Sequence, residues 1–121
     1  SITDAMLKGK PSWSKVHDKA AAFFAKADQV IGHNLTFDMD MINNETRRIQ
    51  ILKSSTPDFP WPRLKMCTVE ATEHLLGRRM KLGELHTHLL GSAFDGAHRA
   101  KADVMALHAV CKKLAENGEI I

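Results

Sequence analysis

Two segments that lie far apart in the sequence each place a histidine and an aspartate at the border of an apolar stretch. They are residues 32–38, with the sequence GHNLTFD, and residues 97–103, with the sequence AHRAKAD. Carboxylates are ligands that Mg²⁺ and Mn²⁺ favour, and a histidine side chain titrates close to neutral pH. The residue types and their spacing therefore suit divalent-metal chemistry, with Asp38, His98 and Asp103 as the candidate residues.

Each aspartate also has an ordinary structural explanation. Asp38 lies one or two residues inside an expected helix start, where backbone N–H groups and the helix dipole favour a carboxylate. Asp103 lies beside an apolar stripe and needs a partner, which is either a metal ion or a surface ion pair with Arg99 or Lys101. Asp40 lies two positions from Asp38, about 200° around a helix, so we interpret it as solvated.

The elements that position these residues follow from hydrophobic periodicity and from glycine and proline breaks. Residues 29–33, stopped by Gly32, and residues 64–68 are the expected strands. Residues 53–62 hold three prolines and are expected to form a loop. The expected helices begin after Pro11 and Ser12 and then cover residues 36–51, 69–76, 82–89 and 99–116. The order αβαβααα, with two parallel strands, predicts an α/β fold.

Three of these helices carry an apolar stripe that we expect to face the core. Ser12 is the expected N-cap of the first one. The stripe residues are Val16, Ala20, Phe23, Phe24 and Ala27 in the first helix, Phe37, Met41, Ile42 and Ile49 in the second, and Ala100, Val104, Leu107, Cys111 and Leu114 in the last.

Length and composition are those of an ordinary globular segment. The 121 residues make one domain at most, and 44% of them are hydrophobic and 26% charged. Apolar runs are far shorter than the ~20 residues that span a bilayer, so we expect no membrane role. Two cysteines are too few for a disulfide framework, which makes the cytoplasm the expected location. A net charge of +3 permits nucleic-acid binding without requiring it, and Trp61 is the aromatic residue expected to be exposed.

The two histidine–aspartate segments resemble the second and third motifs of the DEDDh (DnaQ-like) 3′–5′ exonucleases. That family has Asn-x-x-Phe-Asp at the start of one helix, and Ala-His-Arg-Ala with an aspartate five residues after the histidine at the start of another. Both patterns are present here at residues 34–38 and 97–103. The residues that fall at further consensus positions are the stretch 1–6 (SITDAM), Thr68, Leu82, Leu85 and Gly91. The resemblance covers nearly the whole chain.

The resemblance implies a ribonuclease H-like fold in which residues 1–121 are the C-terminal portion of one exonuclease domain. The family's first motif, Asp-x-Glu on an opening strand, does not occur anywhere in the sequence. We therefore expect a fragment with two parallel strands and flanking helices, from which the N-terminal antiparallel strands are missing. A two-stranded parallel sheet leaves an open edge that natural domains cover. Either the absent strands, another polypeptide or a second copy of the chain would cover it.

The resemblance also implies roles for individual residues. Asp103 would hold the ion that binds the attacking water, Asp38 would help hold the leaving-group ion, and His98 would be the general base. The cofactors would be two Mg²⁺ or Mn²⁺ ions in a complete domain. Phe37 either borders the terminal base of the substrate or, as we favour, packs in the core with partial exposure. Asn34 and His33 are weaker candidates for substrate binding. We favour Asn34 as a turn-former, and His33 is as well explained by a structural hydrogen bond.

The implied function is metal-dependent 3′–5′ exonuclease activity on single-stranded DNA or RNA ends, with this chain incomplete by itself. The alternative is a non-catalytic remnant or split-domain module that binds a polymerase, a partner chain or nucleic acid. Absence of the first motif favours the alternative, whereas retention of His98 and Asp103 disfavours it. A ribonuclease H-type endonuclease fits the spacing of His98 and Asp103 less well.

Overall fold

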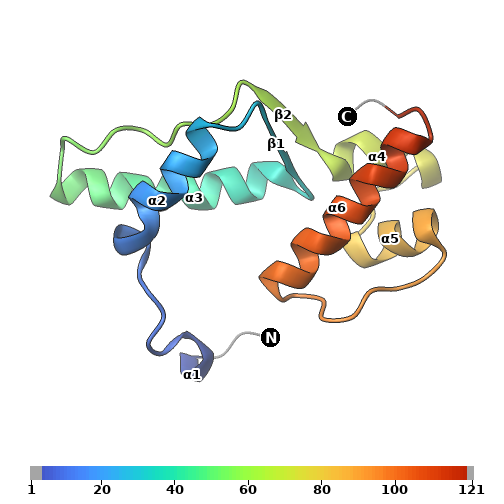
Figure 1. The fold of residues 1–121 in the computed structure, drawn as a ribbon, viewed down its shortest axis with the longest axis horizontal. Coiled ribbons are helices and arrows are strands. Elements are labelled where there is room, and N and C mark those ends of the chain that lie inside the picture. The colour runs from blue at the N-terminus through green and yellow to red at the C-terminus, as the bar shows by residue number, and fades with distance from the viewer. Residues whose placement is uncertain (1–3, 120–121) are drawn as a thin grey trace. The chain divides into compact units, whose positions relative to one another are not determined.

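The computed structural model describes residues 4–119, so part of the 1–6 stretch lies outside the described residues. Two strands pair in one parallel sheet, and the described residues form a mixed α/β arrangement (Figure 1). The elements are α1 (Asp4–Leu7), α2 (Trp13–Ala25), β1 (Gln29–Gly32), α3 (Leu35–Leu52), β2 (Leu64–Cys67), α4 (Thr68–Leu76), α5 (Leu82–Leu90) and α6 (Ala100–Glu116). The predicted order of elements is confirmed, with the short helix α1 added at the start.

Two compact units make up the described chain. The α2–α3 unit consists of residues 4–30 and 36–65, and the α4–α6 unit consists of residues 31–35 and 66–119. Both strands contribute residues to both units. The boundary between the units falls inside the first histidine–aspartate segment, between Leu35 and Thr36, whereas residues 97–103 lie wholly in the α4–α6 unit.

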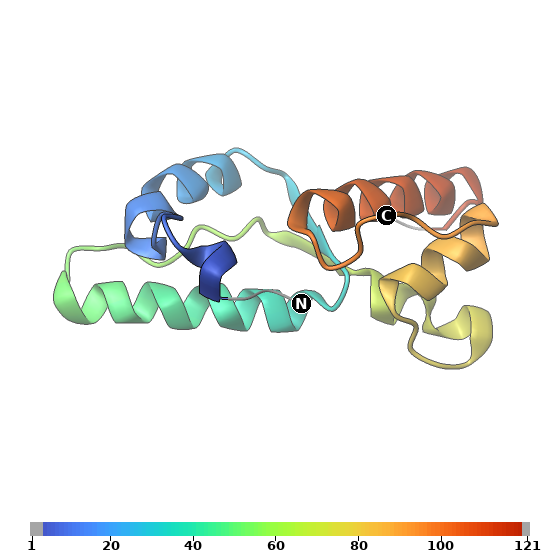
Figure 2. The same ribbon diagram turned by 90° about the horizontal axis from the view of Figure 1, so that it is seen from below.

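The core of the α4–α6 unit lies between its last two helices. The buried apolar residues Met80, Leu85, Val110 and Leu114 form one cluster, and Leu85 and Val110 are fully inaccessible to solvent. Helices α5 and α6 lie side by side in both views (Figures 1 and 2). Burial of these side chains, worth roughly 1.5–3 kcal/mol each, stabilises the helix that carries Asp103.

The α2–α3 unit is organised around Phe59, which is only 6% exposed. The rings of Trp13, His17, Phe24 and Trp61 surround it, with centroids 4.8–6.0 Å from the Phe59 centroid. Aromatic pairs at this distance add to the stability that simple burial gives. The proline-rich segment after α3 is thus held in place by an aromatic core.

The predicted inward faces of three helices are partly wrong. Phe23 of α2 is 70% exposed, Phe37 of α3 is 59% exposed and Val104 of α6 is 64% exposed. On α6 the buried residues are instead Ala106, Val110 and Leu114. They are four positions apart and therefore share one face of the helix. Among the other stripe residues, Ala27, Met41 and Ala100 are exposed as well.

No helix among residues 4–119 has both the length and the apolar character needed to cross a membrane. Cys67 and Cys111 are free thiols, and each is only partly buried.

Candidate active site

The corner between β1 and α3 is built by two residues with special backbone requirements. A Cβ on Gly32 would lie 3.0 Å from Leu35 Cδ1 and 3.2 Å from Leu35 Cα, so a side chain there would displace the helix start. Asn34 adopts a φ of 68°, a left-handed conformation in which asparagine is enriched among non-glycine residues. The chain can therefore pass from strand to helix within two residues, as the predicted turn-forming role of Asn34 requires.

His33 ties this corner to the rest of the α4–α6 unit. Its Nε2 lies 2.7 Å from the carbonyl oxygen of Met80, and its Nδ1 lies 2.9 Å from Thr68 Oγ1. A carbonyl only accepts hydrogen bonds, so Nε2 carries a proton. The Thr68 hydroxyl, which is fully buried, also lies 3.3 Å from the carbonyl oxygen of Gly32 and can donate to it. These contacts support the structural explanation of His33, and its substrate-binding role stays a prediction.

Asp38 and Phe37 both lie in the first turn of α3, and both are exposed. The buried residues of this helix, Leu35 and Thr46, share one face. Phe37 is two positions after Leu35 and so points about 200° away from that face. Our preference for core packing of Phe37 is therefore wrong, while its placement beside the substrate is untested. Asp40 is exposed, as expected.

His98 and Asp103 are brought together at the start of α6. The backbone N–H of His98 donates to Asp103 Oδ1 at 3.1 Å. His98 is exposed and has a φ of 70°, whereas Asp103 is half-buried. On the helix, Asp103 lies about 20° from the direction of fully buried Val110, so it continues the buried face at its N-terminal end. The sequence did not predict this hydrogen bond.

The turn before α6 depends on Gly96. Its φ is 81°, and a Cβ there would lie 3.0 Å from the Cβ of Ala102. The N–H of Arg99 donates to the carbonyl oxygen of Gly96 at 3.1 Å, which closes the turn. The turn at Gly96 thus brings the backbone N–H of His98 to the carboxylate of Asp103.

The predicted catalytic residues divide between the two units. Asp38 belongs to the α2–α3 unit, and His98 and Asp103 belong to the α4–α6 unit. Convergence of Asp38 with the other two therefore stays a prediction. Across residues 4–119, no three His, Cys, Asp or Glu side chains are grouped so that they could hold a metal ion. As donors, the two aspartates fit Mg²⁺ or Mn²⁺, which are commonly held by one or two carboxylates together with substrate phosphates.

Two further histidines, and the groups whose pKa values are shifted, have structural explanations. His86 is buried and its Nδ1 lies 2.6 Å from the carbonyl oxygen of Ser92, while His74 lies 3.6 Å from a carboxylate oxygen of Glu119. Arg78 donates to Glu84 at 2.6 Å, and this hydrogen bond raises the pKa of the guanidinium and lowers the pKa of the carboxyl. Burial raises the pKa of the Cys111 thiol.

Comparison with known proteins assigns the family. The family model RNase_T, described as exonuclease, matches residues 1–111, and the chain belongs to this exonuclease family. The match spans both histidine–aspartate segments and is consistent with a ribonuclease H-like fold. The comparisons with curated proteins and with solved structures find no match.

Proposed function

We propose that this chain is part of a metal-dependent 3′–5′ exonuclease that removes nucleotides from single-stranded DNA or RNA ends. Membership of the exonuclease family supports the reaction class. The observation that carries the proposal is the contact between His98 and Asp103, which fixes a carboxylate next to an exposed imidazole-bearing residue. The cytoplasm is the proposed location, because both cysteines are free thiols.

In the proposed site, Asp38 and Asp103 would hold Mg²⁺ or Mn²⁺. Bound there, the ions would supply Lewis-acid stabilisation of the phosphodiester as it is cleaved. His98 would accept a proton from the water that attacks the phosphorus atom. Its exposure leaves the ring accessible to a substrate, and the hydrogen bond from its own N–H holds its backbone against the carboxylate of Asp103. Phe37, which is exposed beside Asp38, would contact the terminal base, with Asn34 and His33 as weaker candidates.

Asp38 and Asp103 provide one carboxylate for each of two ions, which is few for a site of this kind. The proposed enzyme therefore takes further carboxylates from an Asp-x-Glu strand, supplied by residues other than 1–121. The same strand, a partner chain or a second copy would cover the open edge of the β1–β2 sheet.

A second candidate is a non-catalytic module that binds a polymerase, a partner chain or nucleic acid. It is favoured by the absence of Asp-x-Glu from the sequence. The two candidates differ in one measurable property, which is cleavage.

The test compares two forms on a single-stranded oligonucleotide labelled at its 5′ end. One form is the 121-residue chain, and the other is extended at its N-terminus by a strand carrying Asp-x-Glu. We expect the extended form to produce a ladder of shortened, labelled products with Mg²⁺ or Mn²⁺ and none with EDTA. The 121-residue chain should show negligible cleavage. Full activity of the 121-residue chain, with its mass verified, would contradict the account, and binding without cleavage by both forms would favour the second candidate.

A further inference from the structure

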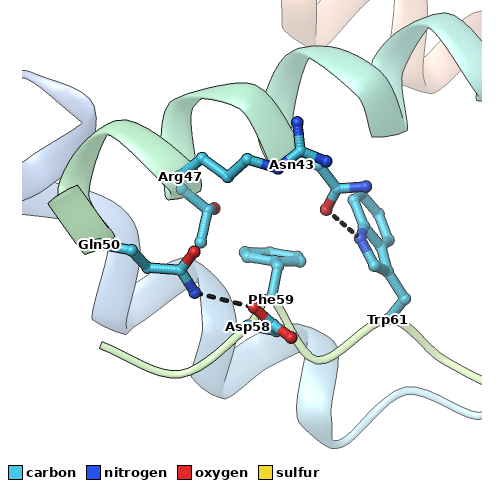
Figure 3. Close-up of a pocket in the computed structure, with 7 residues that line it drawn as sticks. Asn43, Arg47, Gln50, Asp58, Phe59 and Trp61 are labelled. Carbon is cyan, nitrogen blue, oxygen red and sulfur yellow. Dashed lines mark hydrogen bonds between the residues drawn. The ribbon is translucent and has the colours of Figure 1, made fainter. Parts of the chain in front are cut away.

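A half-open pocket of about 370 Å³ lies in the α2–α3 unit, between the C-terminal half of α3 and the segment that follows it (Figure 3). Polar side chains of α3 face an aromatic pair and a carboxylate of the later segment across this space. The residues that Figure 3 labels around it are Asn43, Arg47, Gln50, Asp58, Phe59 and Trp61.

The pocket lies on a different face of α3 from Asp38. At about 100° per residue, Asn43, Arg47 and Gln50 point roughly 140°, 180° and 120° away from Asp38. Arg47 is also nine residues further along the helix, a rise of about 13 Å. The pocket is therefore separate from the carboxylate that we assign to the metal site.

Hydrogen bonds fix the walls of the pocket before any ligand binds. The indole Nε1–H of Trp61 donates to Asn43 Oδ1 at 2.8 Å, and Gln50 Nε2 donates to Asp58 Oδ1 at 2.8 Å (Figure 3). Phe59 is held among the aromatic rings described above. Pre-organised walls lower the entropy cost of binding.

The groups that remain to meet a ligand are of three kinds. The amide of Asn43 keeps its N–H donors, because its oxygen is the atom that binds Trp61. Asp58 offers its second carboxylate oxygen as an acceptor, since Gln50 binds the first. Arg47 is exposed on the rim, where its Nη1 donates to Asn44 Oδ1 at 3.1 Å, and its other N–H donors and positive charge remain for a ligand.

This combination discriminates between ligand classes. One carboxylate beside an arginine is a poor cation site, and the carboxylate opposes a simple anion. A nucleotide matches the full set. Its base has an edge that pairs with amide and carboxylate groups and a face that stacks on an aromatic ring, and its phosphate suits a guanidinium. A cavity of this size accommodates one base and its sugar.

We propose that this pocket binds one nucleotide unit, with the base against Trp61 and Asn43 and the phosphate at Arg47. The unit is either a free nucleoside monophosphate or a residue of a single strand that passes over this face. The site binds without catalysis, so it stands or falls independently of the exonuclease activity proposed above.

The experiment follows the two tryptophan indole N–H signals of the 121-residue chain by NMR, in EDTA so that metal-dependent hydrolysis cannot occur. AMP, GMP, CMP and UMP are titrated one at a time, with ribose 5-phosphate as the ligand that lacks a base. The variant Trp13→Phe assigns the two signals. We expect at least one nucleotide to shift the Trp61 signal in a saturable way and to leave the Trp13 signal nearly unchanged, whereas ribose 5-phosphate shifts neither.

Two variants and one matched control test the assigned contacts. Arg47→Ala should weaken nucleotide binding about tenfold, as loss of a charge-assisted hydrogen bond does. Arg48→Ala is the control, because Arg48 is also exposed on α3 but pairs with Glu45 at 3.0 Å and does not line the pocket. Asn43→Asp keeps an acceptor for Trp61 and removes the amide donors, so it should weaken binding while Trp61 stays hydrogen-bonded.

A short single-stranded oligonucleotide decides the source of the nucleotide. Tighter binding of the oligonucleotide than of the monophosphates assigns the pocket to a strand, and equal or weaker binding assigns it to free nucleotides. The proposal is overturned if no nucleotide shifts the Trp61 indole signal at about 10 mM. At that concentration a site with a Kd of about 1 mM would be mostly occupied. Equal shifts with ribose 5-phosphate, or equal affinities of Arg47→Ala and Arg48→Ala, would also overturn it.

Discussion

The backbone N–H of His98 donates a hydrogen bond to the side chain of Asp103 at 3.1 Å. The carboxylate thus stabilises the turn before α6 as well as serving as a candidate metal ligand. His98 has a φ of 70°, a conformation that is uncommon for a residue other than glycine, and the bond helps to hold it. Structural and catalytic contributions of Asp103 therefore need variants that separate them.

Replacement of Asp103 by asparagine and by alanine separates these contributions. Asparagine keeps an oxygen that can accept from the N–H of His98, so Asp103→Asn should melt close to the parent protein. It should nevertheless abolish turnover in the extended form, because a neutral amide is a poor ligand for Mg²⁺. Asp103→Ala loses the acceptor too and should lower the free energy of unfolding by about 1 kcal/mol. Thermal denaturation and the oligonucleotide assay measure the two effects, and wild-type turnover by Asp103→Asn would remove it from the metal site.

Replacement of His98 by alanine tests the general base. In the extended form, His98→Ala should lower kcat by ~10²–10⁴, the usual contribution of a general base, with little change in substrate affinity. His88→Ala, at an exposed histidine of α5, is the control. Unchanged turnover in His98→Ala at neutral pH would show that another group removes the proton.

Two valines of α6 test which face of that helix is buried. Val110 is fully buried, and Val110→Ala should lower the free energy of unfolding by roughly 1.5–3 kcal/mol. Val104 is 64% exposed, and the same change there should cost less than about 0.5 kcal/mol. Chemical denaturation of both variants gives the comparison. Equal losses would contradict the difference in burial between Val110 and Val104.

Glu84 should make stability depend on pH in acid. The hydrogen bond from Arg78, and after it the one from the N–H of Lys81, lower the pKa of Glu84 in the folded protein. A lowered folded-state pKa gives stability at a pH above the unfolded-state value, and this stability is lost as the pH falls through the folded-state value. Glu84→Gln should therefore melt slightly below the parent at neutral pH and together with it in strong acid.

Because the Arg78–Glu84 pair is exposed, salt should shrink the difference between parent and Glu84→Gln at neutral pH. Glu73→Gln, at an exposed position of α4, provides the matched control for loss of one negative charge. A difference that grows toward acid would contradict the assigned direction of the shift.

Local signals in the sequence were sufficient to place every helix and strand except the short helix α1. Gly91 adopts a φ of 79° at the end of α5, and the prolines after α3 keep the chain out of a helix as predicted. Such signals act over a few residues, so the order of the elements and most of their ends follow from the sequence. The two histidine–aspartate patterns likewise led to the family, because the spacing of a motif is itself a property of the sequence.

Only the tertiary structure decided which face of each helix is buried and which groups meet. Phe37 and Val104 are apolar but exposed, because burial depends on the neighbours that a helix packs against. The bond between His98 and Asp103 needs the left-handed backbone at Gly96 and His98. The nucleotide pocket joins Asn43 to Trp61, which are 18 positions apart, through a fold of the chain around Phe59. Contacts of this kind follow from packing in three dimensions, which no local pattern of residues encodes.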